Sequence, residues 1–176
     1  MTLIIANILT FISNGLVAVS SFCKTKHKMI FIQFIECCIG GVAEILANSM
    51  SAAAQLFLCS FRNAIIYKNP KHKQVYWLLA SAFLILGLIF NNRGLIGLLP
   101  IFATIQYTLW SGYCKNAQGL RYGILINYIP WIIHDFYIKL YVSAFISLCI
   151  MLSVIVSIIK YRNKEKIEAK NNISEL

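Results

Sequence analysis

The stretch that decides the fold is QVYWLLASAFLILGLIF, which runs from Gln74 to Phe90. Between Trp77 and Phe90, only Ser81 and Gly87 interrupt the apolar side chains. A helix of this composition has no polar stripe, so most of its surface is suited to lipid rather than to water. The segment therefore predicts a membrane-spanning helix near the middle of the chain.

Six further apolar runs flank this segment, three on each side. They are Leu3–Phe22, Met29–Ala47 and Ser49–Tyr67 before it, and Gly94–Gly112, Gly119–His134 and Leu140–Ile159 after it. A helix needs about 20 residues to cross the hydrocarbon core, with a usable range of about 17–25. The chain of 176 residues is 59% hydrophobic and only 12% charged, with a mean hydropathy of +0.72. Because helices satisfy their own backbone groups in lipid, we expect an all-α, polytopic membrane protein with about seven transmembrane helices.

The distribution of positive charge predicts the orientation. The net charge is +10, and 13 of the 16 basic residues fall in alternate connections or in the tail after the last run. They are Lys24, Lys26, Lys28, Lys68, Lys71, Lys73, Lys115, Arg121, Lys160, Arg162, Lys164, Lys166 and Lys170. Basic residues in short loops mark the cytoplasmic side, so seven crossings with the N-terminus outside and the C-terminus inside fit the pattern. This interpretation excludes nucleic acid as the partner of the basic residues.

A weak internal repeat suggests the organisation of the chain. Shifting the sequence by about 91 positions places Phe22-Cys23-Lys24 on Tyr113-Cys114-Lys115. We expect a three-plus-one-plus-three plan of two parallel three-helix repeats. The units are residues 1–67 for the first repeat, 68–93 for the linker helix, 94–159 for the second repeat and 160–176 for a basic cytoplasmic tail.

Two charged residues lie on polar stripes inside the apolar runs. Glu36 and Arg62 lie at similar depths, roughly 10 Å and 9 Å from the cytoplasmic edge at a rise of 1.5 Å per residue. The second and third helices are antiparallel neighbours, so the two charges can form an intramembrane pair. Alternatively, Arg62 snorkels to the cytoplasmic edge and Glu36 has another role, such as coupling to protons.

Other polar residues near the middle of the membrane are candidates for solute binding. Asn14, Gln106 and Asn127 carry uncharged amides, which both donate and accept hydrogen bonds. Pro100 and Pro130 are expected to interrupt or kink the fifth and sixth helices and to act in gating. The outer mouth is expected to carry three polar residues: Glu44, His134 and Asp135.

No motif for catalysis, for a cofactor or for a metal is found in the sequence. It has no HExxH, P-loop or GxGxxG pattern, and its six cysteines show no CxxC spacing. We therefore expect no enzyme activity, no cofactor, no metal and no disulfide framework.

Three short motifs resemble the YgjV family of bacterial inner membrane proteins. They are Leu98-Leu99-Pro100, Trp131-Ile132-Ile133-His134-Asp135-Phe136, and Arg62-Asn63 before a basic loop. The resemblance covers nearly the whole chain and implies a multi-pass location in the bacterial inner membrane. That family looks similar to PQ-loop and SWEET-like transporters, although this sequence has no Pro-Gln pair. The resemblance implies Arg62, Pro100, His134 and Asp135 as positions to test.

The leading functional interpretation is a transporter for a small neutral polar solute that works by alternating access between the two repeats. Its expected partners are the lipid bilayer and the solute, with assembly into a homo-oligomer as an open alternative. The competing interpretation is a scaffold or assembly partner that transports nothing and whose polar stripes only hold helices together. A cavity lined by Asn14, Gln106 and Asn127 would favour the transporter.

Overall fold

The computed structural model describes residues 2–46, 50–68, 73–91, 94–137 and 141–174, and for some residues within these ranges it describes the backbone alone. These ranges contain seven helices and no strand, which confirms the all-α prediction. The helices are α1 Thr2–Ser21, α2 Lys26–Leu46, α3 Met50–Tyr67, α4 Gln74–Ile89, α5 Leu98–Tyr113, α6 Ala117–Tyr137 and α7 Tyr141–Ser174. The first six helices coincide with the first six apolar runs within a few residues at the ends, whereas α7 continues 15 residues beyond Ile159 into the predicted basic tail.

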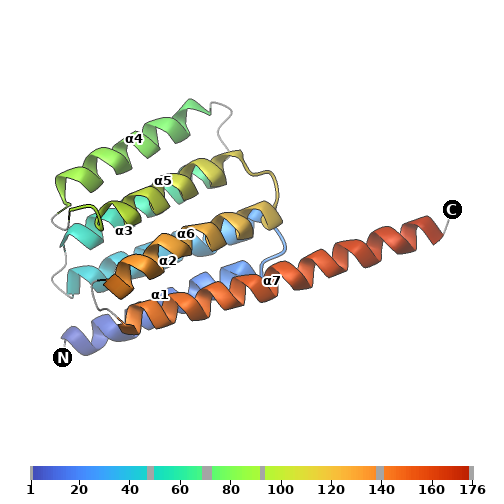
Figure 1. Ribbon diagram of the computed structural model, residues 1–176, viewed down its shortest axis with the longest axis horizontal. Coiled ribbons are helices and arrows are strands. Elements are labelled where there is room, and N and C mark those ends of the chain that lie inside the picture. Colours follow the sequence, from blue (N-terminus) through green and yellow to red (C-terminus); the bar gives the residue numbers. More distant parts are fainter. Residues whose placement is uncertain (1, 47–49, 69–72, 92–93, 138–140, 175–176) are drawn as a thin grey trace.

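The helices form two layers that lie side by side (Figure 1). One layer consists of α1, α2 and α3, and the other consists of α5, α6 and α7, each packed in sequence order. Between the layers, α1 contacts α7, α2 contacts α6, and α3 contacts α5. The linker helix α4 packs mainly on α5 at one edge and touches α3 only lightly. It therefore flanks the two layers instead of separating them.

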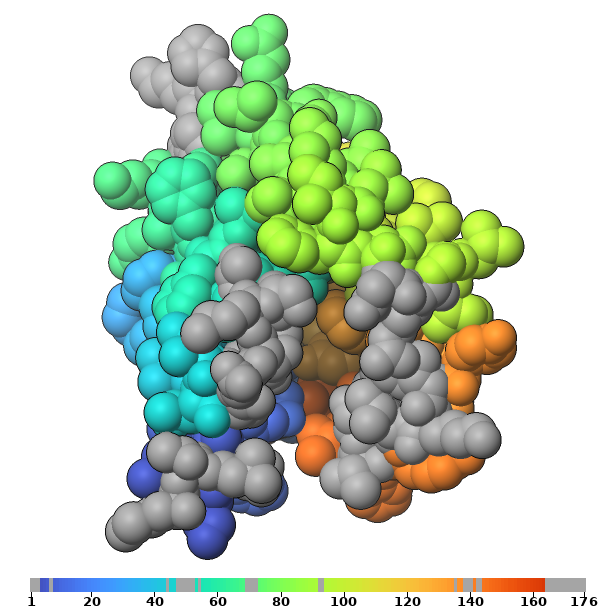
Figure 2. Space-filling model, turned by 90° about the vertical axis from the view of Figure 1, so that its left-hand side faces the viewer, coloured from blue at the N-terminus to red at the C-terminus, as the bar shows by residue number. Residues whose placement is uncertain are grey.

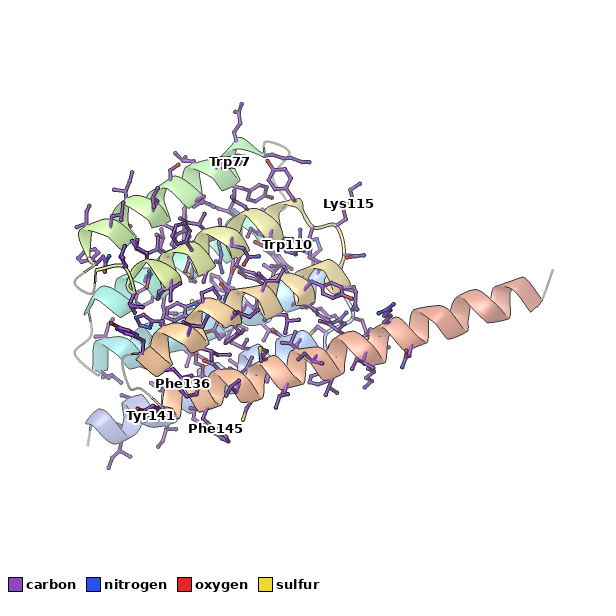
Figure 3. The ribbon with its side chains drawn as sticks, in the orientation of Figure 1. Trp77, Trp110, Lys115, Phe136, Tyr141 and Phe145 are labelled. Carbon is purple, nitrogen blue, oxygen red and sulfur yellow. The ribbon has the colours of Figure 1, made fainter. Side chains whose placement is uncertain are left out.

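One end of the bundle carries most of the described basic residues. The ends of α1, α3, α5 and the starts of α2, α4 and α6 meet there, and α7 continues beyond them (Figure 1). We call it the basic end. Trp77, Trp110 and Lys115 lie towards this end, whereas Phe136, Tyr141 and Phe145 lie towards the opposite end (Figure 3). Aromatic side chains near both ends are typical of membrane–water interfaces.

The apolar core is concentrated in the half of the bundle nearest the basic end. Its main cluster comprises Val17, Met29, Ile30, Ile66, Tyr76, Tyr107, Ala117, Leu120, Ile124, Ile150, Val154 and Ile158. Towards the opposite end, many of the buried apolar side chains are small: Ala6, Ala43, Ala53, Ala103 and Ala144. Large buried side chains are therefore concentrated near the basic end, and small ones predominate towards the opposite end.

A buried arginine fastens the two layers together at the basic end. Arg121 on α6 is 2% exposed, and its Nε and Nη2 donate to the backbone oxygens of Ser21 (2.7 Å) and Cys23 (2.6 Å). These carbonyls lie at the C-terminal end of α1, where helices leave backbone acceptors unpaired and carry partial negative charge. The Arg121 guanidinium also lies 4.1 Å from the centre of the Tyr161 ring on α7. The sequence interpretation assigned Arg121 only to topology, whereas the structure also gives it a packing role.

Within the residues that the structure describes, two helices are long and apolar enough to cross a membrane by length and composition. The apolar segments are Ile4–Ser21 in α1 and Ala144–Asn163 in α7, and the apolar helix Gln74–Ile89 is shorter. The number of crossings and the orientation therefore remain predictions.

Neither Pro100 nor Pro130 interrupts a helix, and their expected roles in kinking and gating stay predictions. Pro100 is the third residue of α5, and the helix begins at Leu98 instead of at Gly94. Proline is tolerated in the first turn of a helix because the amide hydrogen that it lacks would have no partner there. Pro130 lies inside α6, which continues from Ala117 to Tyr137. Pro100 therefore lies in the first turn of a helix, and Pro130 does not end one.

Candidate functional site

A network of polar side chains lies in the interior next to the apolar cluster, and we call it the polar core. Its centre is Arg62 on α3, which is 4% exposed. Nε and Nη2 of Arg62 donate to Oδ1 of Asn63 at 3.2 and 3.0 Å, and Nη1 donates to Oγ1 of Thr108 at 3.4 Å. Since Thr108 belongs to α5, the guanidinium joins the two layers.

Aromatic rings cover the same guanidinium. Its central carbon lies 5.0 Å from the ring centre of Tyr107 and 5.8 Å from that of Phe83. The Tyr107 hydroxyl donates to Oε1 of Gln33 on α2 at 2.7 Å. A cation over an aromatic face is attracted to the ring, more strongly where water is excluded. The positive charge of Arg62 is therefore held by neutral groups from α3, α4 and α5.

Glu36 belongs to the same network but is bonded to other groups. Its Oε1 accepts from Oγ of Ser13 at 3.2 Å, and its Oε2 accepts from Sγ of Cys37 at 3.2 Å. Nδ2 of Asn63 in turn donates to Sγ of Cys37 at 3.7 Å. The carboxylate of Glu36 and the guanidinium of Arg62 are thus linked through Cys37 and Asn63.

This geometry is neither a direct ion pair nor a snorkelling arginine, and a role for Glu36 in proton coupling stays a prediction. Among the described side chains, Glu36 and Arg62 make no direct ion pair, and the buried guanidinium does not reach the aqueous edge. The depths of the two residues were matched along the helices, but their side chains turn to different partners. Depth alone does not specify the direction of a side chain within the bundle.

The three candidate amides lie on three different helices. Asn14 on α1, Gln106 on α5 and Asn127 on α6 are all partly buried. Both Gln106 amide atoms, Oε1 and Nε2, are buried and have no hydrogen-bond partner among the described residues. No hydrogen bond joins the three described side chains to one another, so the structure does not assemble them into one cluster.

The candidate outer-mouth residues lie on α2 and α6. The His134 ring is half-buried and meets the Trp131 ring edge-on, with the ring centres 6.2 Å apart. The backbone positions of Glu44 and Asp135 lie in α2 and α6, but their side chains lie outside the part that the structure describes.

Two polar-core residues on α5 were not singled out from the sequence. Tyr107 and Thr108 belong to a polar face that also includes Thr104 and Ser111, at spacings of three, one and three residues. That spacing is typical of one side of a helix, and all four residues are buried. This polar face could have been predicted from the sequence by looking for polar residues at helical spacing in α5, as was done for the helices that carry Glu36 and Arg62.

A cavity of about 290 Å³ opens at the basic end, between the ends of α2, α3, α4 and α5. Lys26, His27, Lys73 and Lys115 line it, and the apolar residues Ile30 and Ile66 form part of its wall. Ile66 lies one helical turn beyond Arg62, so the cavity is separated from the polar core by about one turn of apolar side chains. None of the three candidate amides lines this cavity.

Comparison with known proteins identifies one family. The model of the family Imp-YgjV, described as a bacterial inner membrane protein, matches residues 4–165. No curated protein and no solved structure matches the chain. The resemblance carried by Leu98–Pro100 and Trp131–Phe136 is confirmed by the family match.

Proposed function

Because the chain belongs to the Imp-YgjV family of bacterial inner membrane proteins, we propose that it is a multi-pass carrier for a small neutral polar solute. The solute moves by alternating access between the layer of α1–α3 and the layer of α5–α7. The protein performs no chemistry on the solute and needs no cofactor.

The observation that carries this proposal is the side chain of Gln106. A buried amide without a partner costs about 1–3 kcal/mol, and lipid supplies no water to satisfy it. Both amide atoms of Gln106 are buried, and neither has a partner among the described residues. A group of this kind is tolerated when a polar solute or water occupies the space beside it during the working cycle.

The uneven packing of the bundle supports the same proposal. Large buried side chains gather near the basic end, and small ones predominate towards the other end. Seen from that other end, the surface is hollowed between α3 and α4 on one side and the orange residues of α6 and α7 on the other (Figure 2). In a carrier, a hollow at this end would give the solute access to the space between the two layers.

The contacts between layers are those that two parallel repeats would make. In two such repeats, a two-fold axis would relate α1 to α5, α2 to α6 and α3 to α7. If α1 contacts α7, this axis requires that α5 also contacts α3. Both contacts are present, and α2 meets α6, as such an axis requires. In this proposal the chain crosses the membrane seven times, with the basic end in the cytoplasm.

The test combines ligand binding with uptake. Purified protein is screened by thermal unfolding against sugars, vitamins and nucleosides, and the solutes that shift the unfolding temperature are then tested for uptake into proteoliposomes. We expect at least one solute to stabilise the wild type and to be transported. Gln106→Leu should keep its yield and unfold at the same or a higher temperature, because it removes an unpaired buried amide. The same variant should lose the solute shift and the uptake.

Gln74→Leu provides the matched control, because Gln74 is exposed at the start of α4. This control should retain both the solute shift and the uptake. If no solute of the panel stabilises the wild type, or if Gln106→Leu transports as well as the wild type does, the carrier proposal fails.

A second candidate function, a scaffold that transports nothing, is favoured by a different observation. Most polar-core side chains are already bonded to one another, as in the contacts of Glu36 with Ser13 and of Tyr107 with Gln33. Bonds of this type hold membrane helices together without a ligand. In a scaffold, Gln106→Leu would raise stability and change no ligand response.

A further inference from the structure

The cavity at the basic end concentrates positive charge in a small space. Lys26, Lys73 and Lys115 line it together with His27, and none of the described residues on its wall is acidic. Lysines that line one cavity without a carboxylate beside them create a positive potential, which favours an anion at that place. We propose that this basic pocket binds a phosphate-type anion, carried either by a lipid headgroup or by a soluble molecule.

The first lysine is fixed in place. Nζ of Lys26 donates to the backbone oxygen of Cys114 at 2.7 Å, which ties the start of α2 to the end of α5. An ammonium group has three donors, and this bond uses one of them. Lys26 is also only partly exposed, so its charge is less screened by water than that of a free surface lysine.

Two aromatic contacts orient other parts of the wall. Nζ of Lys73 lies 4.9 Å from the centre of the Tyr113 ring, and the Tyr113 hydroxyl accepts from Nε1 of Trp77 at 3.1 Å. The ring of His27 meets the ring of Tyr67 edge-on, with the centres 5.0 Å apart. The side chains of Lys73 and His27 are therefore packed against their neighbours on the wall of the cavity.

The nearest carboxylate along α2 lies too far away to neutralise these lysines. Glu36 follows Lys26 by ten residues, which is about 15 Å along a helix. Its two oxygens are bonded to Ser13 and Cys37 in the polar core. The positive end of the α2 dipole adds to the field of the lysines, since α2 begins at Lys26.

The size of the cavity suits a phosphate group with a short attached chain. Its volume of about 290 Å³ lies just below the range of small-molecule sites, which is about 300–1,000 Å³. A basic pocket between membrane helices near the bilayer surface is suited to lipid phosphates, and a soluble phosphate would meet the same donors. The inference does not rest on the carrier proposal, because a scaffold could hold the same anion.

The experiment compares two double variants that remove the same charge. Lys73→Gln with Lys115→Gln removes two lysines from the cavity wall, and Lys24→Gln with Lys28→Gln removes two exposed lysines outside it. Unfolding temperatures are measured in nanodiscs of phosphatidylcholine, with inorganic phosphate or with chloride at equal ionic strength, and in nanodiscs that contain phosphatidylglycerol. A bound anion should raise the unfolding temperature of the wild type by about 5 °C at saturating concentration. The cavity variant should lose most of this shift, and the outer variant should retain it.

The two sources of phosphate give different outcomes. A shift with inorganic phosphate in phosphatidylcholine supports a soluble ligand, whereas a shift confined to phosphatidylglycerol supports a headgroup. The absence of both shifts, or an equal loss of the shift in both double variants, overturns the proposal.

A second measurement needs no variant. Cys114 also lines the cavity, so the bound anion should slow its alkylation several-fold, measured by mass spectrometry of the modified peptides. Alkylation of Cys23, which does not line the cavity, should be unaffected. An unchanged rate at Cys114 in both phosphate and phosphatidylglycerol contradicts the proposal, and neither measurement depends on uptake of any solute.

Discussion

The guanidinium of Arg62 shows how a charged side chain is accommodated inside an apolar bundle without a direct ion pair. Its donors meet two oxygens, on Asn63 and Thr108, and its faces meet the rings of Tyr107 and Phe83. A planar fork with several donors suits such a site, whereas an ammonium group concentrates its charge at one point.

This arrangement makes Arg62→Lys a disruptive change even though the charge is kept. A lysine cannot reach Asn63 and Thr108 together, so we expect a loss of about 1–3 kcal/mol in the free energy of unfolding. Denaturant or thermal unfolding in one type of micelle measures the effect. Arg162→Lys, at an exposed position, should leave stability unchanged. Equal stability of Arg62→Lys and wild type would show that the fork geometry is unimportant.

The thiols at the basic end allow a test of local electrostatics as a function of pH. Burial raises the pKa of the Cys114 thiol, and the Lys26 ammonium offsets part of this rise. Burial also raises the pKa of the Cys23 thiol, which Lys28 and Arg121 offset in part. Both thiols are therefore protonated at neutral pH, and their alkylation should accelerate only as the pH becomes alkaline, because the thiolate is the reactive form.

Single substitutions should separate the two sites. Lys26→Gln removes a charge that favours the Cys114 thiolate, so it should raise the pKa of Cys114 and slow its alkylation at a fixed alkaline pH. Lys28→Gln should do the same to Cys23. The reverse pattern, in which each variant affects the other cysteine, would contradict the placement of the lysines. Alkylation rates of the two peptides across a pH series provide the measurement.

Among the residues of the site, the sequence predicted which ones are polar and inside, but not how they are bonded. Glu36 and Arg62 were found because charged residues in apolar runs are rare and conspicuous. That they bond to Ser13, Asn63 and Thr108 could not be predicted, because hydroxyl and amide groups are common and their contacts depend on the rotation of each helix.

At the scale of elements, the packing of α4 against α5 depends on glycine. A Cβ built on Gly112 would lie 2.5 Å from Cγ of Tyr76, and Tyr76 is 1% exposed. The ring is surrounded on all sides, so it has no room to move away. The close approach of the two helices therefore requires a residue without a side chain at position 112.

We accordingly expect Gly112→Ala to destabilise the protein by about 1–3 kcal/mol through overpacking. Gly15→Ala is the matched control, because a Cβ on Gly15 would meet nothing within 4 Å. That control should be neutral or slightly stabilising, since alanine favours the helix over glycine by up to about 1 kcal/mol. Thermal unfolding of both variants decides the matter, and equal behaviour of the two would refute the predicted contact.

The positions of the helices could be predicted well from the sequence because the hydrophobic runs are long and are separated by short polar segments. The start of α5 was less predictable. Residues 94–97 are apolar apart from two glycines, but they form turns before the helix begins at Leu98. Apolar composition shows which residues can be buried in a bundle or in lipid, but it does not show their backbone conformation. Gly94 has a φ of +60°, which a helix does not allow, so the helix cannot begin there.

For the whole molecule, the distribution of charge makes a prediction that the fold alone does not. Reporter fusions after Lys28, Lys73, Arg121 and Lys166 should all report a cytoplasmic position. A fusion after Leu95, in the turns between α4 and α5, should report the outer side. One fusion of the first group on the outer side, or the Leu95 fusion in the cytoplasm, would contradict seven crossings with the N-terminus outside.

The hydrogen bonds between the two layers also indicate that the chain could be expressed as two separate segments. Hydrogen bonds join Lys26 to Cys114, Gln33 to Tyr107 and Ser21 to Arg121, and each crosses from residues 1–68 to residues 74–176. In a bilayer, where apolar surfaces gain little by leaving lipid for one another, such bonds and close packing decide which helices associate. The two segments, synthesised as separate polypeptides and inserted independently, would present each other with matched donors and acceptors. The contact between the two segments therefore resembles the interface of a heterodimer, although both segments belong to one chain.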